Sequence, residues 1–254
     1  MTHFIAAYHT DAGIRKRVNQ DSLLLKAISN HKEEIVLAVL CDGMGGIAKG
    51  ELASATTILA FSDWFEQTYR KRAGEWKPKE IKEQWQSLFQ QVNQALVRYG
   101  QRNGMHLGTT ATAFLISSKG EYLIGHIGDT RAYLLNHKLI QLTEDHTFIA
   151  REQKRGTMTR EQAEADSRRN VLLQCVGIND FLEPQYAGGR LLKGESVLLC
   201  SDGFRHKVTE KELHEKLRIS TSEEEIRRHL YELTEQNKKR METDNISAIQ
   251  VKLV

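Results

Sequence analysis

The chain has 254 residues, with 36 Lys and Arg against 33 Asp and Glu and a formal net charge of +3 at pH 7. This near balance includes no continuous basic tract, so a nucleic-acid partner is not indicated. No apolar segment approaches the roughly 18 residues of a membrane span, and the N-terminus lacks a signal-peptide pattern, so we expect a cytoplasmic protein without a membrane partner.

No linker rich in Pro, Gly or Ser divides the sequence, which favours a single domain over residues 1–254. The three cysteines, Cys41, Cys175 and Cys200, show no CxxC spacing. We expect unpaired thiols in the core of a protein from a reducing compartment.

An apolar run in residues 35–46 stops at Asp42 and is followed by three glycines, Gly43, Gly45 and Gly46. Its length and its Val, Ile and Leu content predict a buried strand. The glycines indicate a backbone with positive φ or with close approach by another group. An ordinary strand-to-turn transition would give the same Asp-Gly pattern.

Asp21 opens the preceding apolar run, residues 22–28, and a short polar turn joins it to the strand that ends at Asp42. Two strands joined in this way are expected to be antiparallel neighbours. The start of one strand then lies beside the end of the other, so Asp21 and Asp42 should face each other.

The rest of the chain alternates between helix and strand patterns. Amphipathic periodicity predicts helices at residues 51–72 and 78–102. Strand patterns follow at residues 122–127 and 139–142, with a hairpin turn at 136–138. The charged segment 145–169 has capping-box spacing at Thr159 and Gln162, and later helices have the same spacing at Thr209 with Glu212 and Ser222 with Glu225.

Acidic residues recur at the ends of the expected strands. They are Asp42, Asp129 and Asp202, where strands finish, and Asp21 and Asp244, where strands begin. In antiparallel sheets these two kinds of strand end can share one edge, so we expect the acids to form a single cluster there. Carboxylates brought close together raise one another's pKa values unless cations neutralise them, so the pattern predicts a site for several metal ions.

The expected ligands are all oxygen atoms, which suits Mg²⁺ or Mn²⁺ and argues against structural zinc. Two such ions about 3.5–4 Å apart would activate a water molecule for in-line attack on a phosphate ester. The basic residues just before Asp21 could hold the phosphate oxygens.

The ordered motifs GIRKRVNQD, CDGMGG, GTTATA, GHIGDTRAYL, LTEDHT, SRRNVLLQCVG, LLCSDG and TDNIS extend over nearly the whole chain. In this order they resemble the metal-dependent protein serine/threonine phosphatases of the PPM (PP2C) family, in the compact bacterial form. The resemblance implies an α+β fold, a four-layer α/β/β/α sandwich with two central antiparallel sheets. It also implies hydrolysis of phosphoserine and phosphothreonine in proteins by water or hydroxide bound to two Mn²⁺ or Mg²⁺ ions, without a phosphoenzyme.

The same resemblance assigns roles to the acids. Asp42 corresponds to the carboxylate that bridges the two metals, with the Gly43 carbonyl on one ion and Asp202 and Asp244 on the other. Asp21 would act mainly through metal-bound water. With Lys16, the acids Asp42, Asp202 and Asp244 form the expected catalytic set.

A third, more weakly held ion is implied at Asp129, which would share Asp202. The segment at about 147–170 corresponds to the family's flap, which contributes to substrate choice. The resemblance also implies phosphorylated proteins as partners, including a serine/threonine kinase or its substrates, and we expect a monomer.

The phosphate-binding position departs from the family. Many relatives have an arginine five residues before the equivalent of Asp21, whereas this chain has Lys16 between Arg15 and Arg17. Lysine lacks the bidentate fork of arginine, so either Lys16 binds the phosphate less specifically or a neighbour such as Arg17 substitutes for it.

Three further positions differ. Gln20 replaces the common glutamate, Met44 stands where animal relatives carry a histidine, and His206 stands where an aspartate is frequent. The His206 difference bears on the third metal. The departures at Lys16, Gln20 and His206 leave open a second hypothesis, a catalytically weak or inactive module that binds phosphoproteins, and a two-metal nuclease is a third.

Overall fold

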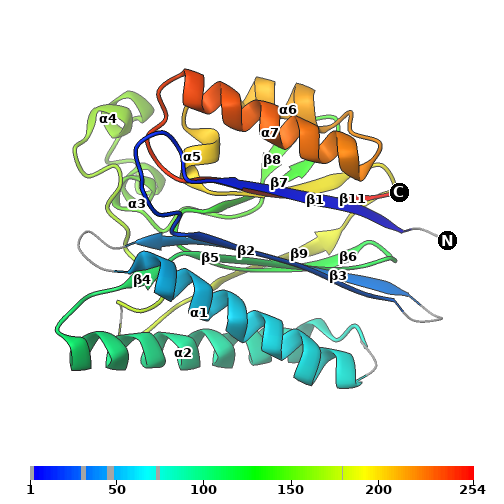
Figure 1. Ribbon diagram of the computed structural model, residues 1–254, viewed down its shortest axis with the longest axis horizontal. Coiled ribbons are helices and arrows are strands. Elements are labelled where there is room, and N and C mark those ends of the chain that lie inside the picture. The colour runs from blue at the N-terminus through cyan, green and yellow to red at the C-terminus, as the bar shows by residue number, and fades with distance from the viewer. Residues whose placement is uncertain (1–2, 30–32, 45–48, 73–74, 179) are drawn as a thin grey trace.

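Two antiparallel β-sheets stack face to face in the middle of the molecule, and helices cover their outer faces (Figure 1). The computed structural model describes residues 3–29, 33–44, 49–72, 75–178 and 180–254. This arrangement is the four-layer α+β sandwich expected from the sequence.

The strands divide between a five-stranded and a six-stranded sheet. The first has the order β1 (Phe4–Asp11), β11 (Ile246–Leu253), β10 (Ser196–Cys200), β7 (Arg131–Leu135) and β8 (Leu139–Gln141). The second has the order β2 (Asp21–Ser29), β3 (Glu34–Met44), β5 (Ala111–Ser117), β6 (Glu121–Ile127) and β9 (Gln185–Arg190), with β4 (Gly108–Thr109) on β3. The sequence did not predict β9, because two of its six residues are glycine and its apolar pattern is weak.

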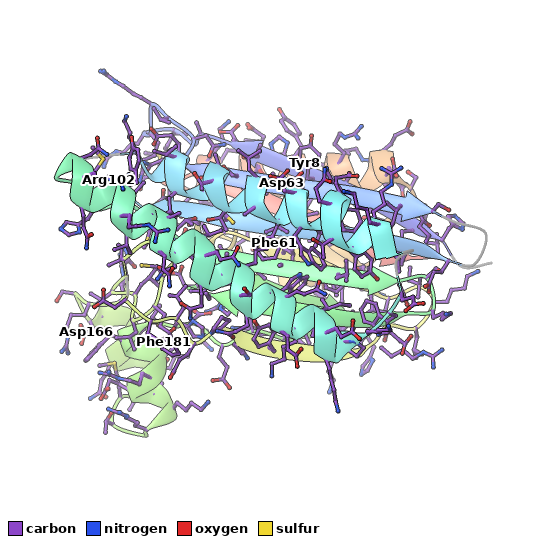
Figure 2. All side chains as sticks on the ribbon, turned by 90° about the horizontal axis from the view of Figure 1, so that it is seen from below. Tyr8, Phe61, Asp63, Arg102, Asp166 and Phe181 are labelled. Atoms are coloured by element: carbon purple, nitrogen blue, oxygen red, sulfur yellow. The ribbon has the colours of Figure 1, made fainter. Side chains whose placement is uncertain are left out.

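Helices form the two outer layers and one end of the sandwich (Figures 1 and 2). The six-stranded sheet is covered by α1 (Gly50–Asp63) and α2 (Pro78–Asn103), and the five-stranded sheet by α6 (Glu210–Leu217) and α7 (Glu223–Lys239). The short helices α3 (Phe148–Lys154), α4 (Arg160–Ala165) and α5 (Asp202–Arg205) lie at the end of the sandwich where β2 begins. No helix in the described ranges is long and apolar enough to cross a membrane.

The helix predicted for residues 51–72 changes its winding in its second half. The α-helical part ends at Asp63, and a π-helical segment, Trp64–Tyr69, and a 3₁₀ turn, Arg70–Arg72, follow. The wider π turn still places the Phe65 and Tyr69 rings in a stack, with centroids 5.8 Å apart. The aromatic periodicity therefore located the buried face correctly but did not reveal the change in winding.

Capping geometry agrees with the sequence at two of three helix starts. Thr159 with Gln162 and Thr209 with Glu212 form complete capping boxes. The third expected box is wrong. Ser222 accepts the backbone N–H of Glu225, but the Glu225 carboxylate accepts from the N–H and hydroxyl of Thr221 instead.

Strand β3 is apolar on both faces because each face packs against a different layer. Ile35, Leu37 and Val39 face α1 and α2, where the Phe61 ring meets Trp85 edge-on at 5.6 Å. Val36 and Leu40 face the opposite sheet. Because side chains alternate along a strand, Asp42 follows Val36 and Leu40 onto the face between the sheets. The fold thus directs this acid into the interior of the sandwich.

Candidate active site

Asp21, at the start of β2, and Asp42, near the end of β3, are cross-strand partners, as the sequence predicted. Asp21 lies on the same face as Leu23 and Leu25, which pack between the sheets, so both carboxylates enter the gap between the two sheets. Only 8% of Asp21 is exposed, and neither of its carboxylate oxygens has a hydrogen-bond partner. The pair therefore brings two acids into one poorly solvated place.

Burial, together with the charges of Asp202 and Asp244, raises the pKa of Asp21 to about 7. The nearby hydroxyls of Ser247 and Ser201 oppose this rise, although neither forms a hydrogen bond of regular geometry with the carboxylate. Below about pH 7 the neutral acid is therefore favoured over the ion unless positive charge is supplied.

The backbone around Asp42 is fixed by the two threonines of the GTTATA motif. The Thr110 hydroxyl accepts the Asp42 N–H at 2.9 Å, and the Thr109 hydroxyl donates to the Asp42 carbonyl at 2.9 Å. Burial, followed by the charges of the other four acids, raises the pKa of Asp42 well above its usual range. The motif thus holds the Asp42 carboxylate in a place where its negative charge is unfavourable. The sequence did not predict this role for Thr109 and Thr110.

Strand β3 does not stop at Asp42 but continues to Met44, because β4 pairs with Gly43 and Met44. A Cβ atom at Gly43 would lie 2.3 Å from the Gly50 carbonyl oxygen and 2.5 Å from that of Gln20. Gly43 therefore serves close backbone approach, one of the two roles expected for it. Gly45 and Gly46 fall outside the described residues.

Asp202 and Asp244 come from the other sheet. Asp202 begins α5 just after β10, and Asp244 lies just before β11, the antiparallel neighbour of β10. The Asp202 side chain is 17% exposed, and its Oδ1 atom has no hydrogen-bond partner. The acids of the two sheets thus meet across the sandwich and raise the pKa values of Asp21 and Asp42, rather than lining one sheet edge.

Lys16 lies against this group of acids. Its Nζ atom is 3.0 Å from Asp244 Oδ1, and the two side chains are 43% and 41% exposed. Its pKa is raised: burial opposes the shift, but the ion pair with Asp244 and the charges of Asp42 and Asp202 outweigh it. In the described part of the chain, neither Arg15 nor Arg17 forms an ion pair with a carboxylate. Of the three basic residues, Lys16 alone is held at the acids.

Asn245 positions the loop that carries Lys16. Its Oδ1 atom accepts the Gln20 N–H at 2.9 Å, and its Nδ2 atom donates to the carbonyls of Ala12 and Val18 at 3.0 and 3.2 Å. Asn245 was not among the site residues predicted from the sequence. Its place beside Asp244 in the TDNIS motif was the available signal.

Asp129 follows β6 and lies at the other side of the group. Burial, followed by the charge of Asp202, raises its pKa to about 7, and Arg205 opposes the rise. Arg205 Nη2 donates to the Asp129 backbone carbonyl at 3.2 Å and lies 3.8 Å from Asp145 Oδ2. Asp129 therefore differs from the other acids because an arginine side chain is hydrogen-bonded to its backbone carbonyl.

Asp145 was not singled out in the sequence, yet it anchors this side of the site. Arg131 donates two hydrogen bonds to its carboxylate, from Nε to Oδ1 at 2.8 Å and from Nη2 to Oδ2 at 2.7 Å. Burial acts to raise the pKa of Asp145, but Arg131 outweighs it and holds the pKa below its ordinary value. Asp145 thus stays ionised as part of a fixed ion pair and is not equivalent to the other acids.

The residues fit divalent cations in their chemistry. Asp21 and Asp202 present buried oxygens without donors, and the shifted pKa values show that the acids lack neutralising charge. Among the described residues, no group of three or more His, Cys, Asp or Glu side chains is placed so that it could hold a metal ion by itself. Hard cations commonly complete their coordination with water and backbone carbonyls, and the carbonyl of Gly43, the residue after Asp42, would be one such ligand.

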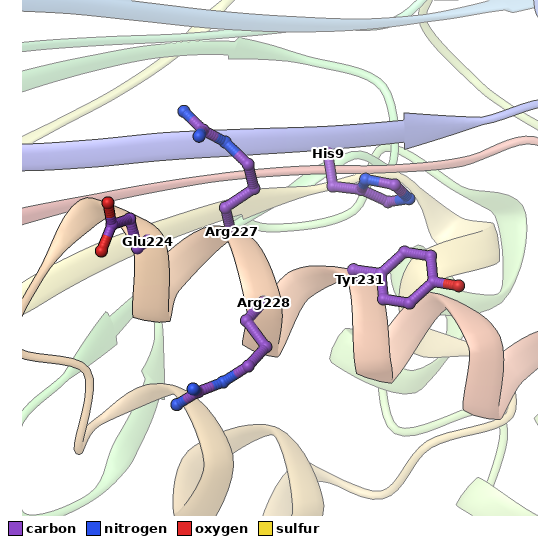
Figure 3. Close-up of a pocket in the computed structure, with 5 residues that line it drawn as sticks. All are labelled: His9, Glu224, Arg227, Arg228 and Tyr231. Carbon is purple, nitrogen blue, oxygen red and sulfur yellow. The ribbon is translucent and has the colours of Figure 1, made fainter.

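A pocket of about 420 Å³ lies elsewhere, between β1 and the first turns of α7 (Figure 3). It is lined by His9, Glu224, Arg227, Arg228 and Tyr231. The rings of His9 and Tyr231 meet edge-on with centroids 5.5 Å apart. None of the five acids lines this pocket, so it is separate from the candidate active site.

Comparison with known proteins agrees with this geometry. Residues 9–243 match the family model of protein phosphatase 2C. The serine/threonine phosphatase stp of Listeria monocytogenes serotype 4b is 33% identical over 218 residues, covering 84% of this chain and 82% of that protein. The S. agalactiae serine/threonine phosphatase structure has a TM-score of 0.85 and 25% identity, covering 98% of this chain and 99% of that one.

A further solved structure, the catalytic domain of the serine/threonine protein phosphatase PstP in complex with 2 manganese ions, has a TM-score of 0.79 and 25% identity. The alignment covers 100% of both chains. The chain therefore belongs to the protein phosphatase 2C family, and it is a protein phosphatase.

Proposed function

We propose that this phosphatase hydrolyses phosphoserine and phosphothreonine in proteins with divalent cations held by its strand-end acids. The proposed ligands are Asp21, Asp42, Gly43, Asp202 and Asp244, and Asp129 is the position that the sequence suggested for a third ion. The observation that carries the proposal is the Asp21–Asp42 pair, two facing carboxylates whose pKa values are raised by burial and by neighbouring acids. Both carboxylates of such a pair can be ionised together only when cations lie beside them.

Each carboxylate is proposed to have a different role in binding the cations. Asp42 would be a ligand of both ions, and the Gly43 carbonyl, Asp202 and Asp244 would supply further oxygen ligands. Asp21 would act through water. When bound, Mn²⁺ or Mg²⁺ would offset the acidic charge and make water a better nucleophile. The support is the all-oxygen character of the group.

Lys16 is proposed to bind the phosphate of the substrate. Its ion pair with Asp244 is half-exposed, so its Nζ atom can exchange this carboxylate for a phosphate oxygen at little cost. Arg17, in the same loop, is the alternative donor. A lysine supplies a point charge rather than a bidentate grip, so we expect phosphate binding to depend on charge more than on orientation.

Cys41 precedes Asp42 but is not a candidate nucleophile. Burial, with the charges of Asp21 and Asp42, raises the pKa of its thiol well above the usual range. A neutral, fully buried thiol is a poor nucleophile. This supports attack by water rather than by a protein side chain.

Residues 1–254 are proposed to form a single catalytic domain. Its flap, at about 147–170, contains α3 and α4 beside the acidic end of the sandwich and would contribute to substrate choice. Phosphorylated proteins, including a serine/threonine kinase or its substrates, are the expected partners of a monomer. The three free cysteines support a cytoplasmic location, where thiols stay reduced.

The direct test is phosphate release from a phosphothreonine peptide, measured with Mn²⁺, with Mg²⁺ and with EDTA. We expect release with either metal, none with EDTA, and none from Asp42→Ala. Peptide binding without phosphate release in any metal would instead indicate a phosphoprotein-binding module. DNA or RNA cleavage at low salt would indicate a nuclease.

A further inference from the structure

The acidic group is neutralised unevenly by the protein's own basic residues. On the Asp129 side, the Arg205 guanidinium donates to the Asp129 carbonyl at 3.2 Å and lies 3.8 Å from Asp145 Oδ2. The Arg205 side chain is only 14% exposed. Arginine stays charged at all physiological pH values, so this side of the site carries a fixed, largely buried positive charge.

His206, the next residue, reinforces this asymmetry. Its Nε2 atom is 3.6 Å from Asp202 Oδ2, and its Nδ1 atom is 3.5 Å from Glu242 Oε2. The ring therefore lies between two carboxylates, one of which belongs to the acidic group. Its Nε2 atom lies beside Asp202 Oδ2, an oxygen of the acid that a third ion would share with Asp129.

Among the residues that the structure describes, none supplies a comparable internal cation on the Asp21–Asp42 side. Both Asp21 oxygens and Asp202 Oδ1 are buried without a hydrogen-bond partner. The basic contact recorded there among the described residues is Lys16 with Asp244, and that pair is over 40% exposed and can separate. Burial raises the pKa of Asp129 to about 7 as well, but Arg205 and His206 act against that rise, whereas the charges that act on Asp21 and Asp42 are those of other acids. External positive charge is therefore needed more at Asp21 and Asp42 than at Asp129.

We propose that Arg205 and His206 take the place of a third cation beside Asp129, so that the site binds two divalent ions rather than three. This inference rests on the proposed metal-dependent function. A dication next to Asp129 would lie beside a guanidinium that cannot lose its charge and would have to displace the imidazole from Asp202. Like charges that lie close together repel strongly when they are shielded from solvent.

The number of bound ions tests this inference independently of activity. Native mass spectrometry and calorimetric titration with Mn²⁺ should give two ions per chain for the unmodified protein. The double variant Arg205→Gln with His206→Asp removes the fixed charge and adds an acid. It should bind a third ion at least about tenfold more tightly than the unmodified protein does, because removing one neighbouring charge is worth ~1.4 kcal/mol or more.

Arg205→Gln alone keeps a donor for the Asp129 carbonyl and so guards against misfolding, and it should show a smaller gain in the same direction. Lys207→Gln is the matched control, because it removes an exposed positive charge from the adjacent position. Its stoichiometry should stay at two. Melting curves would show that each variant is folded.

Three ions of similar affinity in the unmodified protein would overturn the inference and leave the proposed function intact. So would a folded double variant that still binds two. Failure of the unmodified protein to bind any Mn²⁺ would overturn both.

Discussion

Asp21 and Asp42 stand directly opposite each other in β2 and β3, with both carboxylates turned into the space between the sheets. Like charges in such a cross-strand pair destabilise a sheet. The placement is therefore unfavourable for folding in the absence of cations, and the catalytic proposal explains why it is useful.

Replacing Asp21 by Asn should stabilise the metal-free protein, because it removes a buried acid without a partner. The folded-state pKa of Asp21 is about 7, against 3.8 for the free side chain. An acid whose pKa is raised by folding is protonated in the folded state first, so its contribution to stability falls as pH rises from about 4 to about 7. The gain from Asp21→Asn should therefore be larger at pH 7.5 than at pH 4.5.

Melting temperatures in EDTA at several pH values would measure this gain. We expect a difference on the order of 5 °C at pH 7.5, since ~1 kcal/mol corresponds to about 2–4 °C in a chain of this size. The comparison with the unmodified protein is necessary because buried His126, whose pKa is lowered to about 3 chiefly by burial, changes stability in the opposite sense. A gain that shrinks as pH rises would contradict the prediction.

Asp42→Asn should lower kcat by about 10³-fold or more, because the proposed shared ligand is lost while the shape of the side chain is kept. Mn²⁺ should then stabilise the variant against melting less than it stabilises the unmodified protein. Asp63→Asn is the matched control. Asp63 is exposed at the opposite end of α1 (Figure 2), so both measurements should be unchanged. Equal stabilisation by Mn²⁺ in Asp42→Asn would argue against this ligand.

Lys16→Ala should raise KM for a phosphopeptide by about tenfold or more, because a charge-assisted contact with phosphate is worth ~1.5–3 kcal/mol. Lys16→Arg keeps the charge and should restore most of the affinity. Steady-state kinetics would separate KM from kcat. If Arg17→Ala raises KM and Lys16→Ala does not, the phosphate donor is Arg17.

Arg131→Ala should destabilise the fold by about 3 kcal/mol, because the buried Asp145 carboxylate loses both short hydrogen bonds from the guanidinium and keeps only the more distant Arg205 and Gln141. Denaturant unfolding would measure the loss. The control is Lys154→Ala, which removes the ion pair with Glu144, where the side chains are 71% and 64% exposed. Such surface pairs contribute about 0–1 kcal/mol. Comparable losses in the two variants would contradict the importance assigned to Asp145.

The sequence by itself determined the local elements and the identity of the acids. Period-2 and period-3.6 apolar patterns reflect which face of a segment is buried, so they located the helix at 78–102, the strand at 122–127 and the hairpin at 136–138. The short connection between two apolar runs also sufficed to predict the Asp21–Asp42 pairing. These features depend on interactions between residues near one another in the chain.

The tertiary structure alone decided how the acids of two sheets meet and which basic residues lie among them. The contacts of Arg205 with Asp129, and of Arg131 with Asp145, follow from packing between segments that no local pattern relates. The same holds for β9, whose pairing with β6 compensates for its weak strand propensity. Electrostatic balance at the site is a sum over such distant contacts, and for that physical reason only the folded chain specifies it.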